Sequence, residues 1–522
     1  SELASQSQVS IGIGCIYING YININGNTIR QLPGTTSFSG GYIAGITITS
    51  KYGDIFNNTV SNFNLNGSSG VFRGIRTVVA YSDSISITGN TVEGISWENG
   101  FSNGSKNIDA ISSSTSTANS NTSTIIVTNN IVRNLSTHKT GTIAGIHEDA
   151  SLGTKIYQNN QLYNFYTTPG GEGGASLNGI LVDGSGTSAH VVSGNQIYSL
   201  NSTEPVIGTV ASIAGIKLAS GTNSAIYNNR ICDLSSTSTN PTVSGIEITG
   251  GTTNTIYNNR IGDLRAPAAD ARNPINGISI TGSTAAKVNY NTINLNAVST
   301  GTIFGSSGIF YSGEIPIPTL DLRNNIIVNN STPNSVGRTV ALRRSTGSAN
   351  IIPSNYEVTS NNNLFYAGVP STSRLIYAEG ISTLNNIHQL LSTYKTFMST
   401  RDQLSVTENP TFLSAVCGDA GFLKVNPAIP SQVIGGAVNI SGISLDFEND
   451  IRQGNPGYTG TATAPDMGAD ETNSGQAVFC SGTPATSVIN GAGSVCTGSG
   501  TTLTSSSGEY GITYAWFSGI TP

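Results

Sequence analysis

The chain is poor in charge, in methionine and in tryptophan. Only 10% of its 522 residues are charged, methionine and tryptophan number 2 each, and the net charge is −6. This excludes the basic surface that a nucleic-acid-binding protein needs. At 37% hydrophobic residues the chain is also too apolar to be a charged disordered polymer. We therefore expect a folded protein with an uncharged polar surface.

Long apolar runs are absent too. None approaches the ~20 residues of a membrane-spanning helix, so we expect no direct membrane span. No signal peptide begins at Ser1, and residues 1–24 already have a β-rich, repeat-like composition. We therefore expect a fragment or a processed chain with more sequence upstream.

Cysteines are few: Cys15, Cys232, Cys417, Cys480 and Cys496. An odd number over this length does not predict a disulfide framework. No CxxC pair is present, which argues against a zinc ribbon. Cys232 follows an inward-type Ile231, and we expect it to be a buried or turn thiol.

What the chain has in abundance is a repeat, about 30 to 40 residues long. The segments Ile213–Leu234 and Val243–Leu264 each contain three strand signals separated by turns. An asparagine precedes the third strand at Asn27, Asn58, Asn90, Asn130, Asn160, Asn195, Asn229, Asn259, Asn291, Asn325 and Asn363. A Gly-Ile signal recurs in step at Gly45, Gly74, Gly145, Gly179, Gly215, Gly245, Gly277 and Gly308.

Such a repeat predicts a solenoid, because one unit cannot bury its inward side chains but stacked units can. We predict an all-β protein built on a right-handed parallel β-helix, with strands of successive coils about 4.8 Å apart. Asparagine suits a corner because it tolerates the left-handed conformation, and its amides can bond to the next coil in a ladder. A leucine-rich repeat would need a regular leucine pattern, which is missing. A sandwich array would not keep one asparagine phase for so long.

Coil length varies at one corner. The variable segments 98–107, 167–176, 202–212 and 265–274 are rich in Gly, Ser, Thr, Asn and Pro, and we expect loops there. This flank is either a binding surface or a solvated corner where drift is tolerated.

The pattern changes after residue 381. Apolar residues at helical spacing predict an amphipathic helix over Leu384–Met398 that packs near the last coil. We therefore divide the chain into a β-helix (1–381), a C-terminal capping segment (382–475) and the truncated start of another domain (476–522).

Two segments carry family resemblances. Residues Asn426–Ile429, Asp446–Asp450 with Arg452, and Asp466–Glu471 resemble the closing segment of bacterial secreted β-helix proteins of the choice-of-anchor Q type. The departure is Pro430-Ser431, where that family often has an acidic residue and glycine. The resemblance implies the end of a pectate-lyase-like β-helix.

The last segment resembles something else. Cys480–Pro484, Val495-Cys496 and Tyr514–Trp516 are similar to the Ig-like repeats of surface proteins from gliding, type IX-secreting bacteria. A cysteine followed by a tryptophan also fits an Ig-like core. The resemblance implies a secreted or cell-surface location and a secretion or outer-membrane machinery as partner.

One acidic cluster stands out when the coils are aligned on Gly-Ile. Asp149 and Asp183 occupy the same position on adjacent coils, and Glu148 replaces an otherwise apolar, inward residue beside His147. Stacked carboxylates repel unless a cation or a proton joins them, so calcium held by Glu148, Asp149 and Asp183 is the candidate metal site. The alternative is a distorted turn with all four side chains in water. The other histidines, His138, His190 and His388, have no recurring partner.

Other side chains are interpreted more simply. Tyr163, Phe165 and Tyr166 form the densest aromatic group and, with His147, are candidate ligand contacts, although core packing is expected for at least one of the three. Lys217 and Glu247 should stack as an exposed ion pair. Arg230 and Arg260 should stack on each other, with relief from Asp233 and Asp263.

No set of catalytic residues is recognisable, and we expect no catalytic residue and no organic cofactor. The leading hypothesis is a surface scaffold or adhesin, part of a larger multidomain protein, whose partners are glycans or cell-surface polymers. The alternatives are a polysaccharide lyase or another carbohydrate-active enzyme, and a carbohydrate-binding module without turnover. Fold alone does not decide among them.

Overall fold

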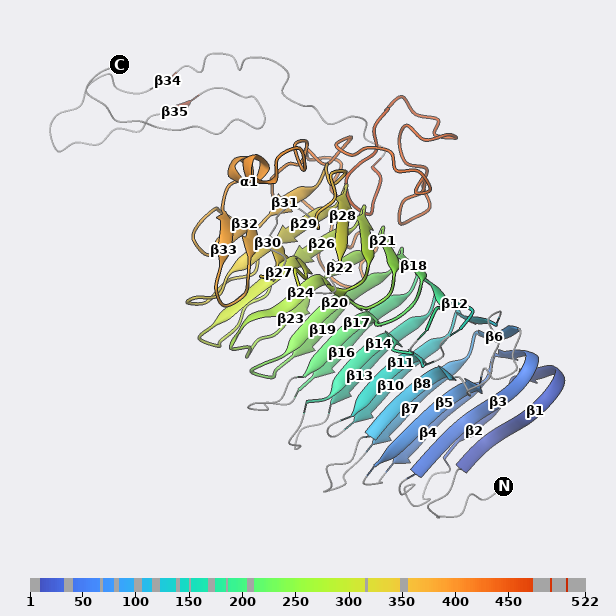
Figure 1. Ribbon diagram of the computed structural model, residues 1–522. Coiled ribbons are helices and arrows are strands. Elements are labelled where there is room, and N and C mark those ends of the chain that lie inside the picture. Colours follow the sequence, from blue (N-terminus) through green and yellow to red (C-terminus); the bar gives the residue numbers. More distant parts are fainter. Residues whose placement is uncertain are drawn as a thin grey trace.

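The structure is a computed structural model that describes residues 10–31, 41–65, 69–78, 84–97, 106–114, 123–137, 141–149, 152–167, 174–184, 186–203, 211–314, 318–347, 355–472, 489–490 and 504–505. The chain forms a nearly all-β parallel solenoid of about nine turns, which confirms the predicted β-helix (Figure 1). The predicted Ig-like start at 476–522 falls almost wholly outside the described residues. Only the short antiparallel pair β34 (Ile489–Asn490) and β35 (Thr504–Ser505) is described there.

Three strips of parallel strands make the walls of the solenoid. The first strip follows the Gly-Ile signals: β5 (Gly70–Val78), β8 (Lys106–Ser114), β11 (Thr142–Glu148), β14 (Ser176–Val182), β17 (Ser212–Leu218), β20 (Thr242–Thr249), β24 (Ala271–Gly282), β27 (Phe304–Tyr311), β30 (Thr339–Arg344) and β32 (Arg374–Glu379). The second strip leads to the asparagine corner: β6 (Ser84–Thr88), β9 (Thr124–Thr128), β12 (Thr154–Gln158), β15 (Ala189–Ser193), β18 (Asn223–Tyr227), β21 (Thr253–Tyr257), β25 (Ala285–Asn289) and β28 (Thr319–Arg323). At the N-terminal end, β1 (Ser10–Asn25) and β3 (Gly41–Phe56) run through both strips.

The third strip follows the asparagine corner and is a separate sheet: β2 (Thr28–Arg30), β4 (Thr59–Leu65), β7 (Thr91–Trp97), β10 (Ile131–Thr137), β13 (Gln161–Thr167), β16 (Gln196–Ser202), β19 (Arg230–Ser236), β22 (Arg260–Gly262), β26 (Thr292–Leu295), β29 (Ile326–Asn329) and β31 (Leu364–Tyr366), with β23 (Leu264–Arg265) beside β19. Equivalent residues of successive coils pair in register, as in Ile216 with Ile246 and Ile246 with Ile278. One continuous apolar core therefore runs along the inside of the rod.

The asparagine ladder is present along the whole corner. Each ladder asparagine donates its backbone N–H and its side-chain amide to Oδ1 of the next, at 2.8–3.1 Å, from Asn27 to Asn363. The expected left-handed conformation belongs to the residue before the ladder asparagine, such as Asn228 (φ 53°) or Asn258 (φ 53°). The corner thus uses two positions: one makes the turn and the next bonds the coils together.

The last coil is closed differently from the prediction. The helix α1 covers only Leu391–Met398, and Asn385–His388 forms β33, antiparallel to β32. An unpaired sheet edge accepts a strand readily, and this competes with the helical pattern. Tyr394 and Met398 of α1 are buried in the end of the core, as predicted for the apolar face.

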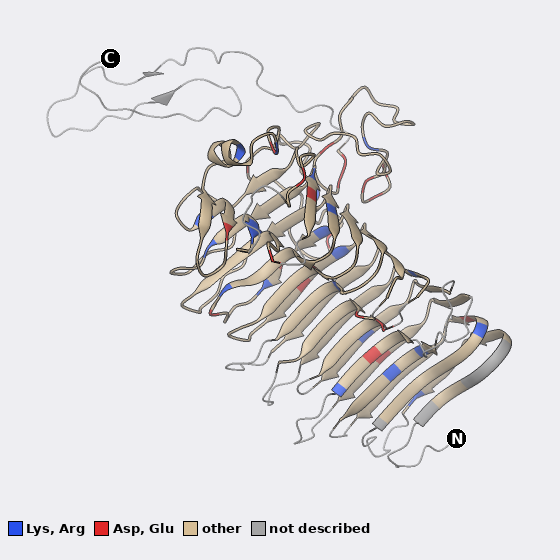
Figure 2. Cartoon of the chain, viewed as in Figure 1, with Lys and Arg blue, Asp and Glu red and all other residues tan. Residues whose placement is uncertain are grey.

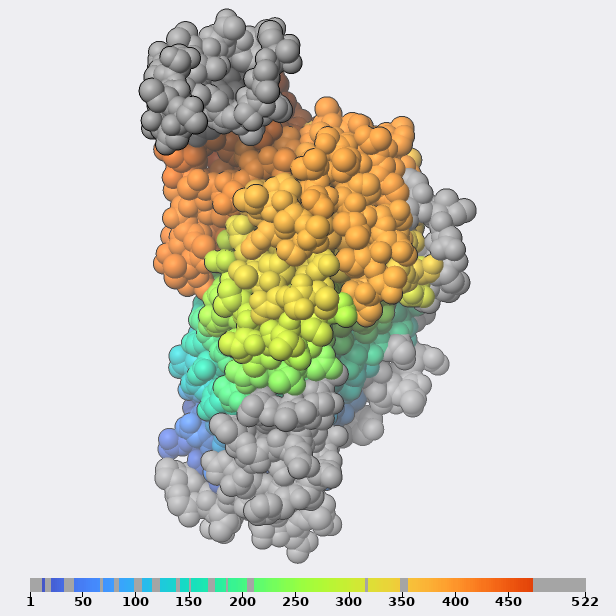
Figure 3. Space-filling view, turned by 90° about the vertical axis from the view of Figure 1, so that its left-hand side faces the viewer, coloured from blue at the N-terminus to red at the C-terminus, as the bar shows by residue number. Residues whose placement is uncertain are grey.

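Residues 406–472 return along the flank of the rod. They contain no helix or regular strand, and they lie beside the asparagine corner rather than over the end of the last coil (Figures 1 and 3). The left-handed corner residues hold them: Asn258 Nδ2 donates to the Leu445 carbonyl at 2.8 Å, and Asn324 Nδ2 to the Val438 carbonyl at 2.7 Å. The corner of the repeat is therefore also the surface that binds residues 406–472.

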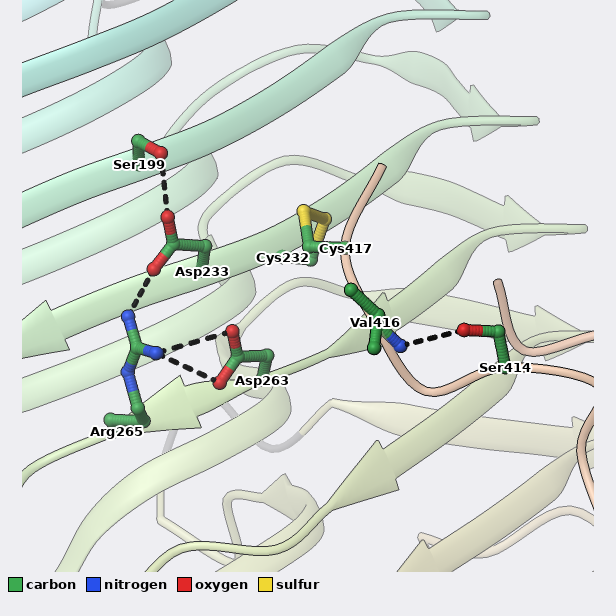
Figure 4. Close-up of a disulfide and its surroundings, with 8 residues drawn as sticks. All are labelled: Ser199, Cys232, Asp233, Asp263, Arg265, Ser414, Val416 and Cys417. Carbon is green, nitrogen blue, oxygen red and sulfur yellow. Dashed lines mark hydrogen bonds and ion pairs between the residues drawn. A yellow bond between two sulfur atoms is a disulfide. The ribbon is translucent and has the colours of Figure 1, made fainter. Parts of the chain in front are cut away.

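A disulfide joins this segment to the rod. Cys232 on β19 is bonded to Cys417, 185 residues later, with Cα atoms 5.8 Å apart (Figure 4). The expectation of a free thiol at Cys232 was therefore wrong. The burial of Cys232 was predicted correctly, but its partner lies on a segment whose return no local pattern reveals.

No helix in the described ranges is long and apolar enough to cross a membrane. Charged side chains are thinly scattered over the strands (Figure 2).

Candidate functional site

A dense group of charges lies on the outer face of the first strip. His147 on β11 bridges two carboxylates: Nδ1 is 3.0 Å from Asp109 Oδ1 on β8, and Nε2 is 2.9 Å from Asp183 Oδ1 just after β14. Arg73 on β5 lies 3.4 Å from Asp109 Oδ2 and 3.9 Å from Asp149 Oδ2. In-register pairing of four adjacent coils brings these residues together. We call Arg73, Asp109, His147, Asp149 and Asp183 the outer cluster.

Electrostatics fix the protonation of this cluster. Burial by itself lowers the pKa of His147, but hydrogen bonds to Asp109 and Asp183 outweigh it and raise the pKa to about 10. The imidazole is therefore a cation at neutral pH and has no lone pair to act as a base. Burial raises the pKa of Asp149, while the charges of His147 and Arg73 oppose that shift.

A second arginine and a tyrosine extend the outer cluster toward the N-terminus. Arg76 donates to the Tyr42 hydroxyl at 3.1 Å and to Ser114 Oγ at 3.0 Å. Both Arg73 and Arg76 lie over the Tyr42 ring, at 5.4 and 5.3 Å from its centroid. The cationic side chains on this face are thus each bonded or stacked, while the Asp149 and Asp183 carboxylates stay partly open to solvent.

Glu148 points into the rod, as the alignment predicted. The Tyr157 hydroxyl donates to Glu148 Oε2 at 2.5 Å, and His190 Nε2 lies 3.1 Å from the same oxygen; Glu148 and His190 are fully buried. The Nζ atom of Lys155, also buried, donates to the Leu152 carbonyl at 2.6 Å. Burial lowers the pKa of Lys155, and the Glu148 charge partly restores it. A polar cluster therefore replaces apolar core over these coils.

The proposed calcium ligands do not converge. Glu148 faces the interior, whereas Asp149 and Asp183 bond to the outer cluster, so the wall of the solenoid separates the first from the other two. Nor do all four side chains lie in water, because Glu148 is inaccessible to solvent. The alternation of a strand sends neighbouring side chains to opposite faces, which is why sequence neighbours are separated here.

A different acidic group lies on the C-terminal segment. Ligand atoms of Asp446, Glu448 and Asp470 fall within 4.8 Å of one another. Cationic side chains already neutralise it: Arg260 bonds both Glu448 and Asp470 at 2.7–2.8 Å, and Lys424 Nζ is 3.0 Å from Glu448. Two of the three carboxylates, Glu448 and Asp470, are therefore already neutralised by Arg260 of the rod and Lys424 of the same segment.

The same segment explains the stacked arginines. Arg230 and Arg260 are paired in register, as predicted. Relief does not come from Asp233 and Asp263, however, because both of these carboxylates bond to Arg265 (Figure 4). Glu448 and Asp470, more than 180 residues away in sequence, neutralise Arg260 instead. The predicted Lys217–Glu247 ion pair is present at 3.1 Å.

The predicted aromatic group divides between the two faces of β13. Phe165 is buried in the core, whereas Tyr166 is 37% exposed. Tyr163 stacks on Tyr198 with centroids 4.8 Å apart, and its hydroxyl accepts a hydrogen bond from Arg133 at 3.1 Å. Their role in ligand binding stays a prediction.

Several members of these clusters were missed from the sequence. Arg73 and Asp109 occupy the position before the Gly of Gly-Ile, so extending the coil alignment by one residue would have found them. His190, which had no recurring partner in sequence, approaches Glu148 across the interior. His138 lies outside the described residues. No periodic signal in the sequence indicates a contact between side chains across the interior of the solenoid.

Comparison with protein-family models, with curated proteins and with solved structures finds no match to this chain.

Proposed function

We propose that the chain is a rigid, non-catalytic scaffold or adhesin of the extracellular cell surface, built to present its flanks to glycans or other surface polymers. The observation that carries this proposal is the fixing of residues 406–472 along the rod by the Cys232–Cys417 disulfide and by buried Arg260. A rod braced over its C-terminal coils suits a spacer better than an enzyme that must open and close.

The same disulfide supports the proposed location. Disulfides persist in oxidising compartments, which favours a secreted or surface protein. The resemblance of residues 480–516 to Ig-like repeats of gliding, type IX-secreting bacteria, and of residues 426–471 to a choice-of-anchor Q closing segment, supports secretion through that machinery and a place in a larger adhesin.

The outer cluster supports a role without turnover. His147 is held as a cation between two carboxylates, and the arginines beside it are paired, so neither the imidazole nor a guanidinium there is a free base at neutral pH. The charges stabilise adjacent coils, which is a structural role.

The direct test measures binding and turnover on the same polysaccharides. The chain is applied to a glycan array and to whole bacterial and host cells, and in parallel is incubated with acidic and neutral polysaccharides with and without calcium. Binding without release of unsaturated or reducing ends is the expected result. Release of such ends would contradict the scaffold proposal.

A polysaccharide-degrading enzyme is the second candidate, favoured by one observation. Asp149, whose pKa burial raises, and Asp183 occupy equivalent positions on adjacent coils of an outer face, and a pair of carboxyl groups is what glycoside hydrolysis uses. If turnover is found, Asp149→Asn and Asp183→Asn should lower it at least about 100-fold. Asp233→Asn, a remote surface carboxylate, is the matched control.

A further inference from the structure

A pocket of about 420 Å³ lies where the docked C-terminal segment ends along the asparagine corner. Its walls come from the corner between β12 and β13, from the equivalent corners of the next two coils, and from Phe447 and Asn449. The volume is in the lower part of the range for small-molecule sites, about 300–1,000 Å³. Neither the outer cluster nor the disulfide takes part in it.

Arg230 supplies a positive charge to this pocket. It is stacked in register on Arg260, but Glu448 and Asp470 bond only to Arg260, and among the described residues no carboxylate bonds to Arg230. Its guanidinium carbon lies 5.9 Å from the centroid of the Phe422 ring. Burial, followed by the nearby charge of Arg260, lowers its pKa, and the charge of Glu448 opposes the shift only in part. An anion placed here would offset the repulsion between the two arginines.

Aromatic rings form two walls. Tyr227 stacks on Tyr257 with centroids 4.7 Å apart. On the opposite side its register partner is Ser193, whose short side chain is too small to cover a ring. Phe447 faces the pocket from the C-terminal segment and is backed by Arg260, 4.1 Å from its centroid. The stack of tyrosines therefore ends at the pocket with one ring face open.

Amide side chains complete the lining. Asn159, Gln196 and Asn449 are exposed around the opening and offer both donors and acceptors. Oδ1 of Asn228 is buried with no hydrogen-bond partner in the described part of the chain. No acidic residue lines the pocket. One unpaired cation, an open ring face and several amides together match a ligand with a negative charge, an apolar ring face and many hydroxyl groups.

We propose that this pocket binds a carboxylated sugar residue of an acidic polysaccharide, with the carboxylate on Arg230, the sugar ring against Tyr227 and the hydroxyl groups on the surrounding amides. The site goes beyond the scaffold role, which would stand even if the pocket bound nothing. It would give the rod a defined attachment point on its flank, beside the docked segment.

The test is calorimetric titration of the full chain with galacturonic acid oligosaccharides and with their methyl esters, which keep the ring and hydroxyl groups but lose the charge. We expect binding of the acid and at least tenfold weaker binding of the ester. Arg230→Gln should weaken binding of the acid roughly tenfold or more, because a hydrogen bond to a charged group is lost. Asn449→Gly, which keeps the left-handed backbone (φ 71°) at this exposed position but removes the amide, should also weaken it.

Arg133→Gln is the matched control. Arg133 is another outward arginine of the same sheet, but Glu93 and Tyr163 already bind it, so its removal should leave the titration unchanged. Failure of the acid to bind, or equal weakening by Arg133→Gln and Arg230→Gln, would overturn the proposal. So would equal binding of inorganic sulfate or phosphate, since that would mark a simple anion site. If the unmodified chain does not bind the acid but still attaches to cells, the pocket proposal is overturned and the scaffold role stands.

Discussion

Replacing Arg260 by glutamine should release the C-terminal segment from the flank of the rod. The Arg260 side chain is fully buried, bonds Glu448 and Asp470, and covers the ring of Phe447. Removing one partner of a buried ion pair costs about 3–5 kcal/mol, because the charges left behind have lost water as well as their partner. A cost of 3 kcal/mol corresponds to roughly a 100-fold rise in the population that opens locally.

Hydrogen exchange followed by mass spectrometry measures that opening directly. Amides of residues 445–471 should exchange roughly 100-fold faster in Arg260→Gln, while the core strands keep their protection. Arg265→Gln is the matched control: Arg265 also bonds two carboxylates, Asp233 and Asp263, but its side chain is 45% exposed (Figure 4). Exposed pairs contribute at most about 1 kcal/mol. Equal increases in exchange rate for the two substitutions would refute the reasoning that burial sets the energy of these ion pairs.

Three further outcomes are expected. Asn229→Ala should lower the free energy of unfolding by about 3 kcal/mol, measured by chemical denaturation, because it leaves buried partners of the ladder unpaired; an unchanged midpoint would contradict the ladder's role. Cys417→Ser should make residues 406–472 susceptible to limited proteolysis, with an intact rod as the product, whereas resistance equal to the parent would show that the disulfide is dispensable. Burial raises the pKa of Asp470 to about 7 and of Glu471 to about 8. The stability that their protonated forms contribute is therefore full near pH 4 and is lost as pH rises through 7 and 8. Hydrogen exchange of residues 406–472, corrected for intrinsic rates, should speed up between about pH 5 and 8.5, and exchange that slows over this range would contradict the prediction.

The pKa of His147 adds to the same trend at higher pH. Its folded-state pKa of about 10 lies above the ordinary value of 6.5, so the stability gained from the bonds to Asp109 and Asp183 is complete below pH 6.5 and is lost as pH rises through 10. His147→Gln should remove this dependence.

Prediction from the sequence worked best where a property repeats. The column of asparagines and the Gly-Ile signal predicted the coil length, the strand register and the residues that face inward. The register is well determined because a shift of one residue would move every inward side chain of a strand to the outer face. The inward direction of Glu148 and the stacking of Arg230 on Arg260 followed from the same alignment. Where a pattern is local and not repeated, tertiary contacts can override it. Residues 385–388 have helical spacing but instead pair with the sheet edge as β33.

The candidate site was only half predictable. His147, Asp149 and Asp183 were recognised, since they break the repeat at known positions. Their partners Arg73 and Asp109 come from coils up to two turns away, and His190 reaches Glu148 across the interior. A charged residue that interrupts the repeat is visible in the sequence. The residue that it bonds to depends on which coils are adjacent and which side chains meet in the interior.

By itself the sequence determined the solenoid, because periodic burial and periodic corners can be satisfied together in only one way, by stacking like on like. Only the tertiary structure decided where residues 406–472 go, that Cys232 pairs with Cys417, and that Arg260 is neutralised while Arg230 is not. These contacts join positions about 180 or more residues apart that share no period. Their energies depend on burial, which exists only once the rod has formed and the segment has returned along it.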